Sequence, residues 1–267
     1  MTDTYLDEIL ERKRKEVRAR SAQLDVAELR VAELRCQRDA LAALRAAEGL
    51  AVIAEHKRAS PSRGPIRPGS NAAEIARGYE LAGANAISVL TDEAGFDGRP
   101  QDLIDVRAAV QLPVLCKDFI VCPSQIWEAR LWGADLVLLI VAALNKKELS
   151  GLHRLATGLG MAVLVEVHDA QELAAAVDIG ATLIGVNNRN LHTFEVDLEV
   201  SEKLAPRFPD GVFRVSESGI RTAADLVRLR DAGYHGVLIG ERFMQEPDPG
   251  AALSGLLKSA GVPRSAA

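Results

Sequence analysis

Apolar runs that end in polar or charged residues recur along this chain, and they are its strongest structural signal. The runs are AVIAEHK (51–57), PVLCKDF (113–119), AVLVEVH (162–168), LIGVNNR (183–189) and FRVSESG (213–219). Such nearly continuous apolarity is typical of parallel strands that are covered on both faces. Burying a charge is costly unless the charge is paired, so several charges at strand ends indicate one shared polar pocket.

The same pattern predicts eight strands with helices between them. The expected strands span 51–55, 86–90, 113–117, 135–140, 162–166, 183–187, 212–216 and 236–239. Helix starts are marked by a cap-like residue with an acid three positions later, as in Asn71/Glu74, Asn145/Glu148, Asp169/Glu172 and Thr222/Asp225. Helix ends are marked by glycines that recur at intervals of about 50 residues, namely Gly83, Gly133, Gly180 and Gly233.

Eight strand–helix units in 267 residues predict an α/β protein with a (β/α)8 barrel. An open doubly wound sheet is the alternative, but no G-x-G-x-x-G follows the first strand. Residues 1–48 contain no glycine and show helical spacing from Leu6 to Val17 and again from 26 to 47. We therefore expect a helical extension over 1–48 and a barrel over 49–267, forming one domain. A solvated extension or a dimer contact is the favoured role for the helices, ahead of direct substrate contact.

Composition and charge exclude several classes of protein. A net charge of −5 argues against a general nucleic-acid binder. The three cysteines, Cys36, Cys116 and Cys122, lack metal-site spacing and suit a reducing compartment, with Cys116 expected in the core. No apolar run is long enough to span a membrane, and the N-terminus lacks a signal-peptide core. We expect a cytoplasmic protein that binds neither nucleic acid nor membrane.

Two strand ends carry a lysine. Residues two apart on a strand share a face, so Glu55 with Lys57, and Lys117 with Phe119, are expected to project into the pocket together. Glu55 and Lys57 form a candidate proton-transfer pair, and Ser60 is a candidate anion ligand. Lys117 is a candidate general acid or Schiff-base amine. Desolvation would move the pKa of its ammonium group towards neutrality. The structural alternative is a lysine paired with its neighbour Asp118.

Later strand ends add a carboxylate, an amide and a guanidinium. Burial is expected to raise the pKa of Glu166 towards that of a general base. Its spacing to His168 resembles a metal pair, but no third ligand follows, and Asp169 is better explained as a helix cap. Asn187 and Arg189 suit the binding of a carboxylate or the polarisation of an oxygen.

Two glycine-containing turns come after the seventh and eighth strands. They are Ser216–Ile220, with Glu217, Ser218 and Gly219, and Leu238–Glu241, with Gly240 and Glu241. Backbone N–H groups at these positions form the phosphate site common in barrels of this kind. The sequence therefore predicts a phosphorylated small-molecule ligand.

Together these segments resemble the indole-3-glycerol phosphate synthase family. The matching motifs are AEHKRASPSRG, SVLTDE, LPVLCKDF, LLIVAAL, VEVHD, IGVNNRNLHTFEVDL, VSESGI and GVLIGE. The resemblance implies a barrel with an N-terminal helical extension over its mouth. It also implies conversion of 1-(2-carboxyphenylamino)-1-deoxyribulose 5-phosphate to indole-3-glycerol phosphate, CO2 and water, with no metal or organic cofactor. The chain differs from the family after Glu93 and at Cys122.

The resemblance also implies a role for each candidate residue. The implied catalytic residues are Glu55, Lys57, Lys117, Glu166, Asn187 and Ser218. The implied substrate-binding residues are Ser60, Phe119, Arg189 and Glu217, and the phosphate ligands are Gly219, Gly240 and Glu241. Lys117 would protonate the ribulose carbonyl, and Glu55, Lys57 and Glu166 would share the proton transfers of the dehydration.

Two other functions stay open. One is a lyase or isomerase acting on another sugar phosphate through a Schiff base at Lys117. The other is a phosphate-ligand sensor on an inactive barrel, although the strand-end acids are all present. We expect a monofunctional enzyme that is a monomer or a weak homo-oligomer.

Overall fold

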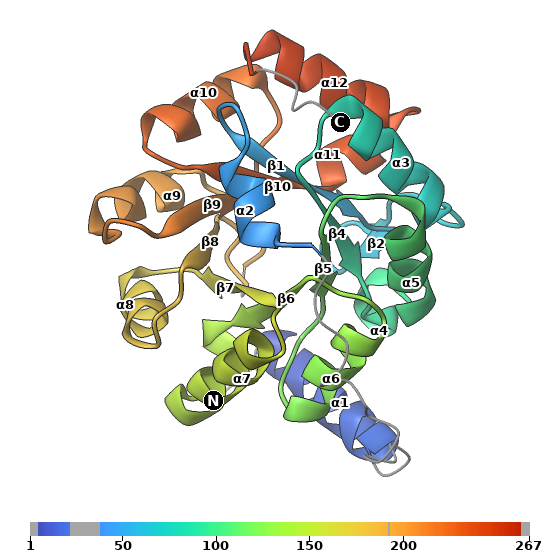
Figure 1. The fold of residues 1–267 in the computed structure, drawn as a ribbon, viewed down its shortest axis with the longest axis vertical. Helices are drawn as coiled ribbons and strands as arrows, with labels where there is room; N and C mark the ends of the chain where they lie inside the picture. Colours follow the sequence, from blue (N-terminus) through green and yellow to red (C-terminus); the bar gives the residue numbers. More distant parts are fainter. Residues whose placement is uncertain (1–4, 22–37, 192, 263–267) are drawn as a thin grey trace.

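The strands of this protein close into a barrel. The computed structural model describes residues 5–21, 38–191 and 193–262. The parallel strands follow the order β1-β10-β9-β8-β7-β6-β5-β4, and β1 pairs with both β10 and β4 to complete the ring (Figure 1). The predicted (β/α)8 barrel is therefore confirmed, because an open doubly wound sheet would leave two strand edges unpaired.

The strand predictions agree with the structure to within one residue at each end. The barrel strands are β1 Ala51–His56, β4 Ala86–Leu90, β5 Val114–Lys117, β6 Leu136–Ile140, β7 Ala162–Val167, β8 Leu183–Asn187, β9 Phe213–Glu217 and β10 Gly236–Ile239. A short antiparallel pair, β2 Ala59–Ser60 and β3 Gly64–Pro65, lies in the first loop and was not predicted. Two-residue strands have no hydrophobic period, so the sequence carries no signal for them.

Helices cover the outside of the barrel. They are α3 Ala72–Ala82, α4 Glu93–Phe96, α5 Pro100–Ala109, α6 Pro123–Leu131, α7 Lys146–Gly158, α8 Ala170–Asp178, α9 Glu199–Leu204, α10 Ala223–Asp231, α11 Glu241–Met244 and α12 Pro249–Ser259. The predicted caps are confirmed, since the side chains of Asn71, Asn145, Asp169 and Thr222 accept backbone N–H groups of the first helical turn. The predicted helix-ending glycines have positive φ, from 80° at Gly180 to 101° at Gly83.

The hydrophobic core has two layers separated by the sheet. Outward-facing strand residues such as Val52 and Cys116 pack against the helices. Inward-facing residues such as Ile53, Leu164 and Phe213 fill the lower part of the barrel. Cys116 is 1% exposed, which confirms its expected place in the core.

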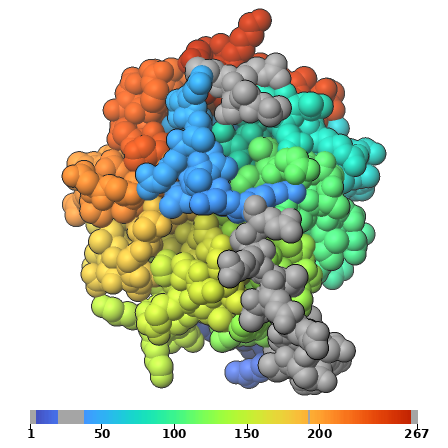
Figure 2. All heavy atoms as spheres, viewed as in Figure 1, coloured from blue at the N-terminus to red at the C-terminus, as the bar shows by residue number. Residues whose placement is uncertain are grey.

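The two N-terminal helices lie at opposite ends of the barrel. Helix α2 (Ala40–Arg45) packs Ala40 and Leu44 against the base of the barrel, and the Arg45 guanidinium lies 5.9 Å from the centre of the Phe213 ring. Figures 1 and 2 show this segment, in blue, across the end of the barrel. Residues 26–37 of the second predicted helix lie outside the described residues. The prediction of a helical extension over the mouth is therefore confirmed for α1 but not for α2, which lies at the base.

Helix α1 (Tyr5–Ser21) is fixed at the mouth by buried charges. Lys13 is 2% exposed, and its Nζ lies 2.5 Å from Asp92 Oδ1 and 2.8 Å from Asp118 Oδ1. Arg12 donates to the same Asp92 carboxylate at 3.1 Å. The prediction of a solvated helix is wrong for α1, because Leu6, Leu10 and Lys13 are buried against the barrel. Removing either partner of the Lys13 ion pairs would leave a buried charge uncompensated.

Among the described residues, no helix combines the length and the apolarity required to cross a membrane.

Candidate active site

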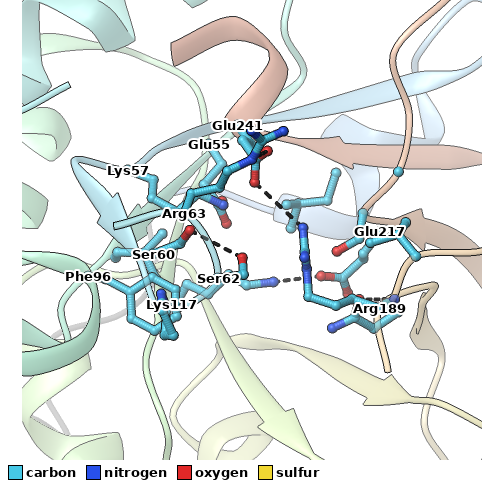
Figure 3. A pocket seen from close by; sticks show the side chains of 18 of the residues that line it. Glu55, Lys57, Ser60, Ser62, Arg63, Phe96, Lys117, Arg189, Glu217 and Glu241 are labelled. Carbon is cyan, nitrogen blue, oxygen red and sulfur yellow. Dashed lines mark hydrogen bonds and ion pairs between the residues drawn. The ribbon is translucent and has the colours of Figure 1, made fainter. Parts of the chain in front are cut away.

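A cavity of about 600 Å³ lies at the C-terminal ends of the barrel strands. Its wall includes every candidate residue from the sequence: Glu55, Lys57, Ser60, Lys117, Phe119, Glu166, Asn187, Arg189, Glu217, Ser218, Gly219, Gly240 and Glu241. Figure 3 shows Glu55, Lys57, Lys117, Arg189 and Glu217 around one space, which they reach from the ends of β1, β5, β8 and β9. The strands bring these residues together because their carboxyl ends share one rim of the barrel.

Lys117 lies among carboxylates. Its Nζ is 2.6 Å from Glu217 Oε2 and 3.5 Å from Glu166 Oε2. Burial by itself would lower the pKa of Lys117, but the carboxylates of Glu217, Glu166 and Glu55 outweigh it and raise the pKa well above its ordinary value. The expectation that the pKa of Lys117 moves towards neutrality is therefore wrong, and the Lys117 side chain is held as an ammonium.

Lys117 makes no ion pair with its neighbour Asp118. Adjacent strand residues face opposite sides, and Asp118 turns away to bind Lys13 and to accept a hydrogen bond from Thr91 Oγ1 at 2.8 Å. The structural alternative for Lys117 is therefore wrong, because the carboxylates that hold it come from strands β7 and β9.

The two carboxylates next to Lys117 differ in their ionisation. Burial would raise the pKa of Glu166, but Lys117, His168 and Asn187 lower it to about 2. Burial raises the pKa of Glu217 to about 7 against the effect of Lys117. Glu166 Oε1 accepts from Asn187 Nδ2 at 3.1 Å, whereas the buried Glu217 Oε1 has no hydrogen-bond partner. The prediction of a raised pKa for Glu166 is therefore wrong, and Glu217 holds an extra proton more readily than Glu166 does.

Two glycines make room for the buried carboxylates. A Cβ at Gly185 would lie 2.1 Å from Glu217 Oε1, and one at Gly240 would lie 2.5 Å from Glu55 Oε1. Any side chain at Gly185 would displace the Glu217 carboxylate or the strand. Gly240 therefore has a steric role within the barrel as well as its expected place in the turn.

A second ammonium–carboxylate pair lies on β1. Lys57 Nζ is 2.8 Å from Glu55 Oε1, and the Glu55 side chain is 4% exposed. Burial would raise the pKa of Glu55, but Lys57 and Lys117 lower it. In the loop that follows, Ser60 and Ser62 lie with their hydroxyl oxygens 3.5 Å apart (Figure 3). The pocket thus holds two separate acid–base pairs.

Two arginines meet Glu241 at the rim. Arg63 Nε lies 2.9 Å from Glu241 Oε1, and Arg189 Nη2 lies 3.5 Å from Glu241 Oε2 (Figure 3). Arg63 lies in the AEHKRASPSRG segment but was not among the candidate residues predicted from the sequence. A long loop carries no register, so which of its cations reaches the pocket is decided by the loop's folded path.

The turn after β9 has an unusual backbone. Ser218 and Gly219 both have positive φ, 66° and 82°. For serine this conformation is strained, and such strain occurs preferentially at functional sites. Asn188 Nδ2 fixes the turn by donating to the carbonyl oxygens of Glu217 at 2.9 Å and Ser218 at 3.1 Å.

One wall of the cavity is apolar. Phe96 and Phe119 lie with ring centroids 6.2 Å apart, and Leu138 and Ile140 of β6 belong to the same lining. Helix α1 adds Tyr5, Leu6 and Ile9. Period-two spacing on β6 could have identified Leu138 and Ile140, but the α1 residues are far away in sequence.

Within the described part of the chain, no three His, Cys, Asp or Glu side chains gather in a way that could hold a metal ion. Asp169 accepts the N–H groups of Gln171 and Glu172 and caps α8, as predicted. The polar side chains that line the pocket carry ammonium, carboxylate, guanidinium, hydroxyl and amide groups.

Comparison with known proteins gives one consistent result. The family model for indole-3-glycerol phosphate synthase matches residues 6–256. This chain belongs to the indole-3-glycerol phosphate synthase family. It is 50% identical over 262 residues to the indole-3-glycerol phosphate synthase of Mycolicibacterium gilvum, covering 97% of this chain and 96% of the relative. It is 53% identical over 243 residues to that of Chlorobium luteolum, covering 89% and 92%.

Solved structures of other enzymes share the fold of this synthase-family chain. A 3-hexulose-6-phosphate synthase superposes with a TM-score of 0.62 at 16% identity, covering 79% of this chain and 99% of that one. A thiamine phosphate pyrophosphorylase from Pyrococcus furiosus gives 0.60 at 18% identity, covering 82% of this chain and 98% of that one. At this identity the likeness concerns the barrel alone.

Proposed function

We propose that this chain converts 1-(2-carboxyphenylamino)-1-deoxyribulose 5-phosphate to indole-3-glycerol phosphate, CO2 and water, a carbon–carbon lyase step of tryptophan biosynthesis. The observation that carries the proposal is the Lys117 ammonium, held between Glu217 and Glu166 in the cavity. Membership of the indole-3-glycerol phosphate synthase family supports the same reaction.

The first stage requires an acid at a carbonyl. As the aromatic carbon attacks the ribulose C2 carbonyl, Lys117 donates a proton to the carbonyl oxygen, and loss of CO2 restores the aromatic ring. The raised pKa of Lys117 keeps the group protonated before the reaction, and its position in the cavity next to Glu217 and Glu166 supports its role as the proton donor. The Schiff-base alternative requires a neutral amine, which the surrounding carboxylates disfavour.

The second stage requires loss of a hydroxyl as water together with loss of a proton. Lys57, paired with Glu55 at 2.8 Å, is positioned as the acid for the hydroxyl. Glu166 is the proposed base, because its basicity increases once Lys117 has given up its proton. Asn187 would orient Glu166 and the intermediate, and Ser218 would line the site next to Glu217.

The remaining residues would hold the anions and the rings. The backbone of Gly219, Gly240 and Glu241 would bind phosphate, with Arg189 and Ser60 contacting the anionic substrate. Phe119 would lie against the aromatic ring. We also infer one domain, with residues 1–48 as an extension, a cytoplasmic location, and a monomer or weak homo-oligomer.

The test is direct. The substrate is added to purified protein without metal, and the formation of indole-3-glycerol phosphate is followed by the fluorescence of its indole ring. We expect a signal that saturates with substrate. Folded protein that binds the compound without turnover would support the sensor alternative, and a borohydride-trapped adduct on Lys117 would support the Schiff-base alternative.

A further inference from the structure

A histidine lies behind Glu166, outside the lining of the reaction cavity. His168 Nε2 is 3.5 Å from Glu166 Oε1, and His168 Nδ1 is 3.0 Å from Glu172 Oε2. The His168 side chain is 16% exposed, and its Nε2 is buried with no hydrogen-bond partner. Glu166 presents its other oxygen, Oε2, to Lys117. His168 and Lys117 therefore lie next to different oxygens of the same Glu166 carboxylate.

The ring lies between two carboxylates, and this decides its protonation. Nδ1 lies within hydrogen-bond distance of Glu172 and Nε2 within ion-pair distance of Glu166, and two nearby negative charges favour the protonated, positively charged ring. Burial would lower the pKa of His168, but Glu166 and Glu172 outweigh it and raise the pKa to about 10. His168 is therefore an imidazolium at neutral pH.

Glu172 is fixed in place by the start of α8. Its Oε2 also accepts the backbone N–H of His168 at 2.8 Å, and its own backbone N–H is capped by Asp169. A second cavity of about 400 Å³ adjoins His168. The charged groups around it, besides His168, are Asp169, Glu172, Arg189, Glu195 and Asp197. Carboxylates outnumber cations there, so the surroundings favour the charged ring.

We propose that His168 is a positioning residue that keeps Glu166 ionised and its Oε2 directed at Lys117, so that the extra proton of the carboxylate pair resides on Glu217. Charges then alternate from Glu172 through His168 and Glu166 to Lys117, and Glu217 carries the extra proton. Without the imidazolium, Glu166 would compete for that proton and would be a weaker partner for Lys117. The inference rests on the proposed function for its effect on turnover, but the charge on the ring can be measured without substrate.

The first experiment reads the ring itself. Protein labelled with ¹⁵N-histidine is titrated by NMR without substrate, and the His168 signal is identified by its loss in H168A. We expect a doubly protonated ring at pH 8, and in E172Q a titration at least one pH unit lower. A neutral His168 ring at pH 8 in the unaltered protein would overturn the proposal, whatever the enzyme's substrate.

The second experiment measures the consequence for turnover. We expect H168A to lower kcat about tenfold with KM within about twofold, and E172Q to act in the same direction. The double variant should be no worse than H168A, because Glu172 acts only through His168. The acid limb of the rate profile should move to higher pH in H168A, since Glu166 then protonates more easily. His235 at the base of the barrel supplies the matched control, H235A, with unchanged kcat.

The outcomes separate the two hypotheses. Absence of turnover in the unaltered protein, with a charged His168 ring, would reject the proposed function and leave the ring's assignment intact. Normal kcat and an unmoved acid limb in both H168A and E172Q would overturn the positioning role. E172Q carries the test by itself if H168A does not fold.

Discussion

The base and the mouth of the barrel interior are built from the same strands and differ in chemistry. On β7, Leu164 faces inward at the base and Glu166 faces inward two residues later. On β9, Val215 is followed in the same way by Glu217. Both carboxylates are as buried as the core, at 3% and 1% exposure. Depth of burial therefore does not distinguish the two regions.

The difference lies in what the buried groups contact. The base is filled with apolar side chains, whose removal from water stabilises the fold. The mouth holds charges that are tolerated because Lys117 and Lys57 lie within ion-pair distance of the carboxylates. Such buried pairs add little net stability, since desolvation offsets their attraction. We therefore expect changes at the base to act on folding and changes at the mouth to act on turnover.

The largest effect is expected at Lys117. K117A should lower turnover at least ~100-fold while the fold remains intact, because no other group near the carbonyl supplies its proton. Turnover is measured by indole fluorescence, and folding by circular dichroism. K146A, which removes an exposed lysine of α7, is the control. Turnover of K117A within about tenfold of normal would remove Lys117 from the mechanism.

At the base, L164A should act on stability. Leu164 is fully buried, so its truncation should lower the free energy of unfolding by about 2–5 kcal/mol in urea. Turnover per folded molecule should stay within about threefold, because the cavity wall above is unchanged. L81A removes a leucine that is 72% exposed and should change the free energy of unfolding by less than ~0.5 kcal/mol. If L164A and L81A lowered the free energy of unfolding by the same amount, the base of the barrel would not be the region that stabilises the fold.

Glu217 should make stability depend on pH. Its pKa is raised from 4.5 to about 7 in the native state. Between these pH values the native state retains a proton that the unfolded chain releases, so stability should fall as pH rises through the window. The loss is roughly 3 kcal/mol at most. Glu166, with its pKa lowered to about 2, acts only below about pH 4.5 and does not interfere.

E217Q should remove the contribution of Glu217 to the difference between the urea unfolding free energies at pH 5 and pH 7. His168, with its pKa raised to about 10, and His56, with its pKa lowered to about 4, contribute alike to the variant and the unaltered protein. E199Q, an exposed change on α9, should leave the slope as it is. An unaltered slope in E217Q would mean that another group holds the proton.

The smallest effect on stability is expected at the rim. R63A breaks an ion pair with Glu241 in which Arg63 is 49% exposed, and should lower the free energy of unfolding by less than about 1 kcal/mol. The KM for substrate should still rise a few-fold if Arg63 helps to bind an anion, and R63K should recover part of it. A fall in the melting temperature of R63A as large as that of L164A would show that the rim stabilises the fold as much as the base does.

Much of this organisation was predictable because it is local. Strand boundaries followed from apolar runs, caps from side chains that bind the next turn, and helix ends from glycines such as Gly83 and Gly233. The candidate residues could be selected because each ends such a run, and a barrel places all run ends at one rim.

Three features could not be predicted, and each depends on a contact between distant segments. The position of α1 at the mouth depends on Lys13 meeting Asp92 and Asp118, which come from other parts of the sequence. The position of α2 at the base depends on the shape of the barrel's closed end. Arg63 reaches Glu241 only along the folded path of its loop.

Local signals in the sequence were enough to predict the barrel, the order of its strands and helices, and the polar residues at its mouth, because periodicity and capping act between near neighbours in the chain. The distribution of protons at the mouth follows from contacts that form only in the folded protein. Burial alone predicts a raised pKa for Glu166 and a lowered one for Lys117, and both expectations were wrong. Ionisation depends on which charges lie within a few ångströms, and those charges arrive from strands far apart in the sequence.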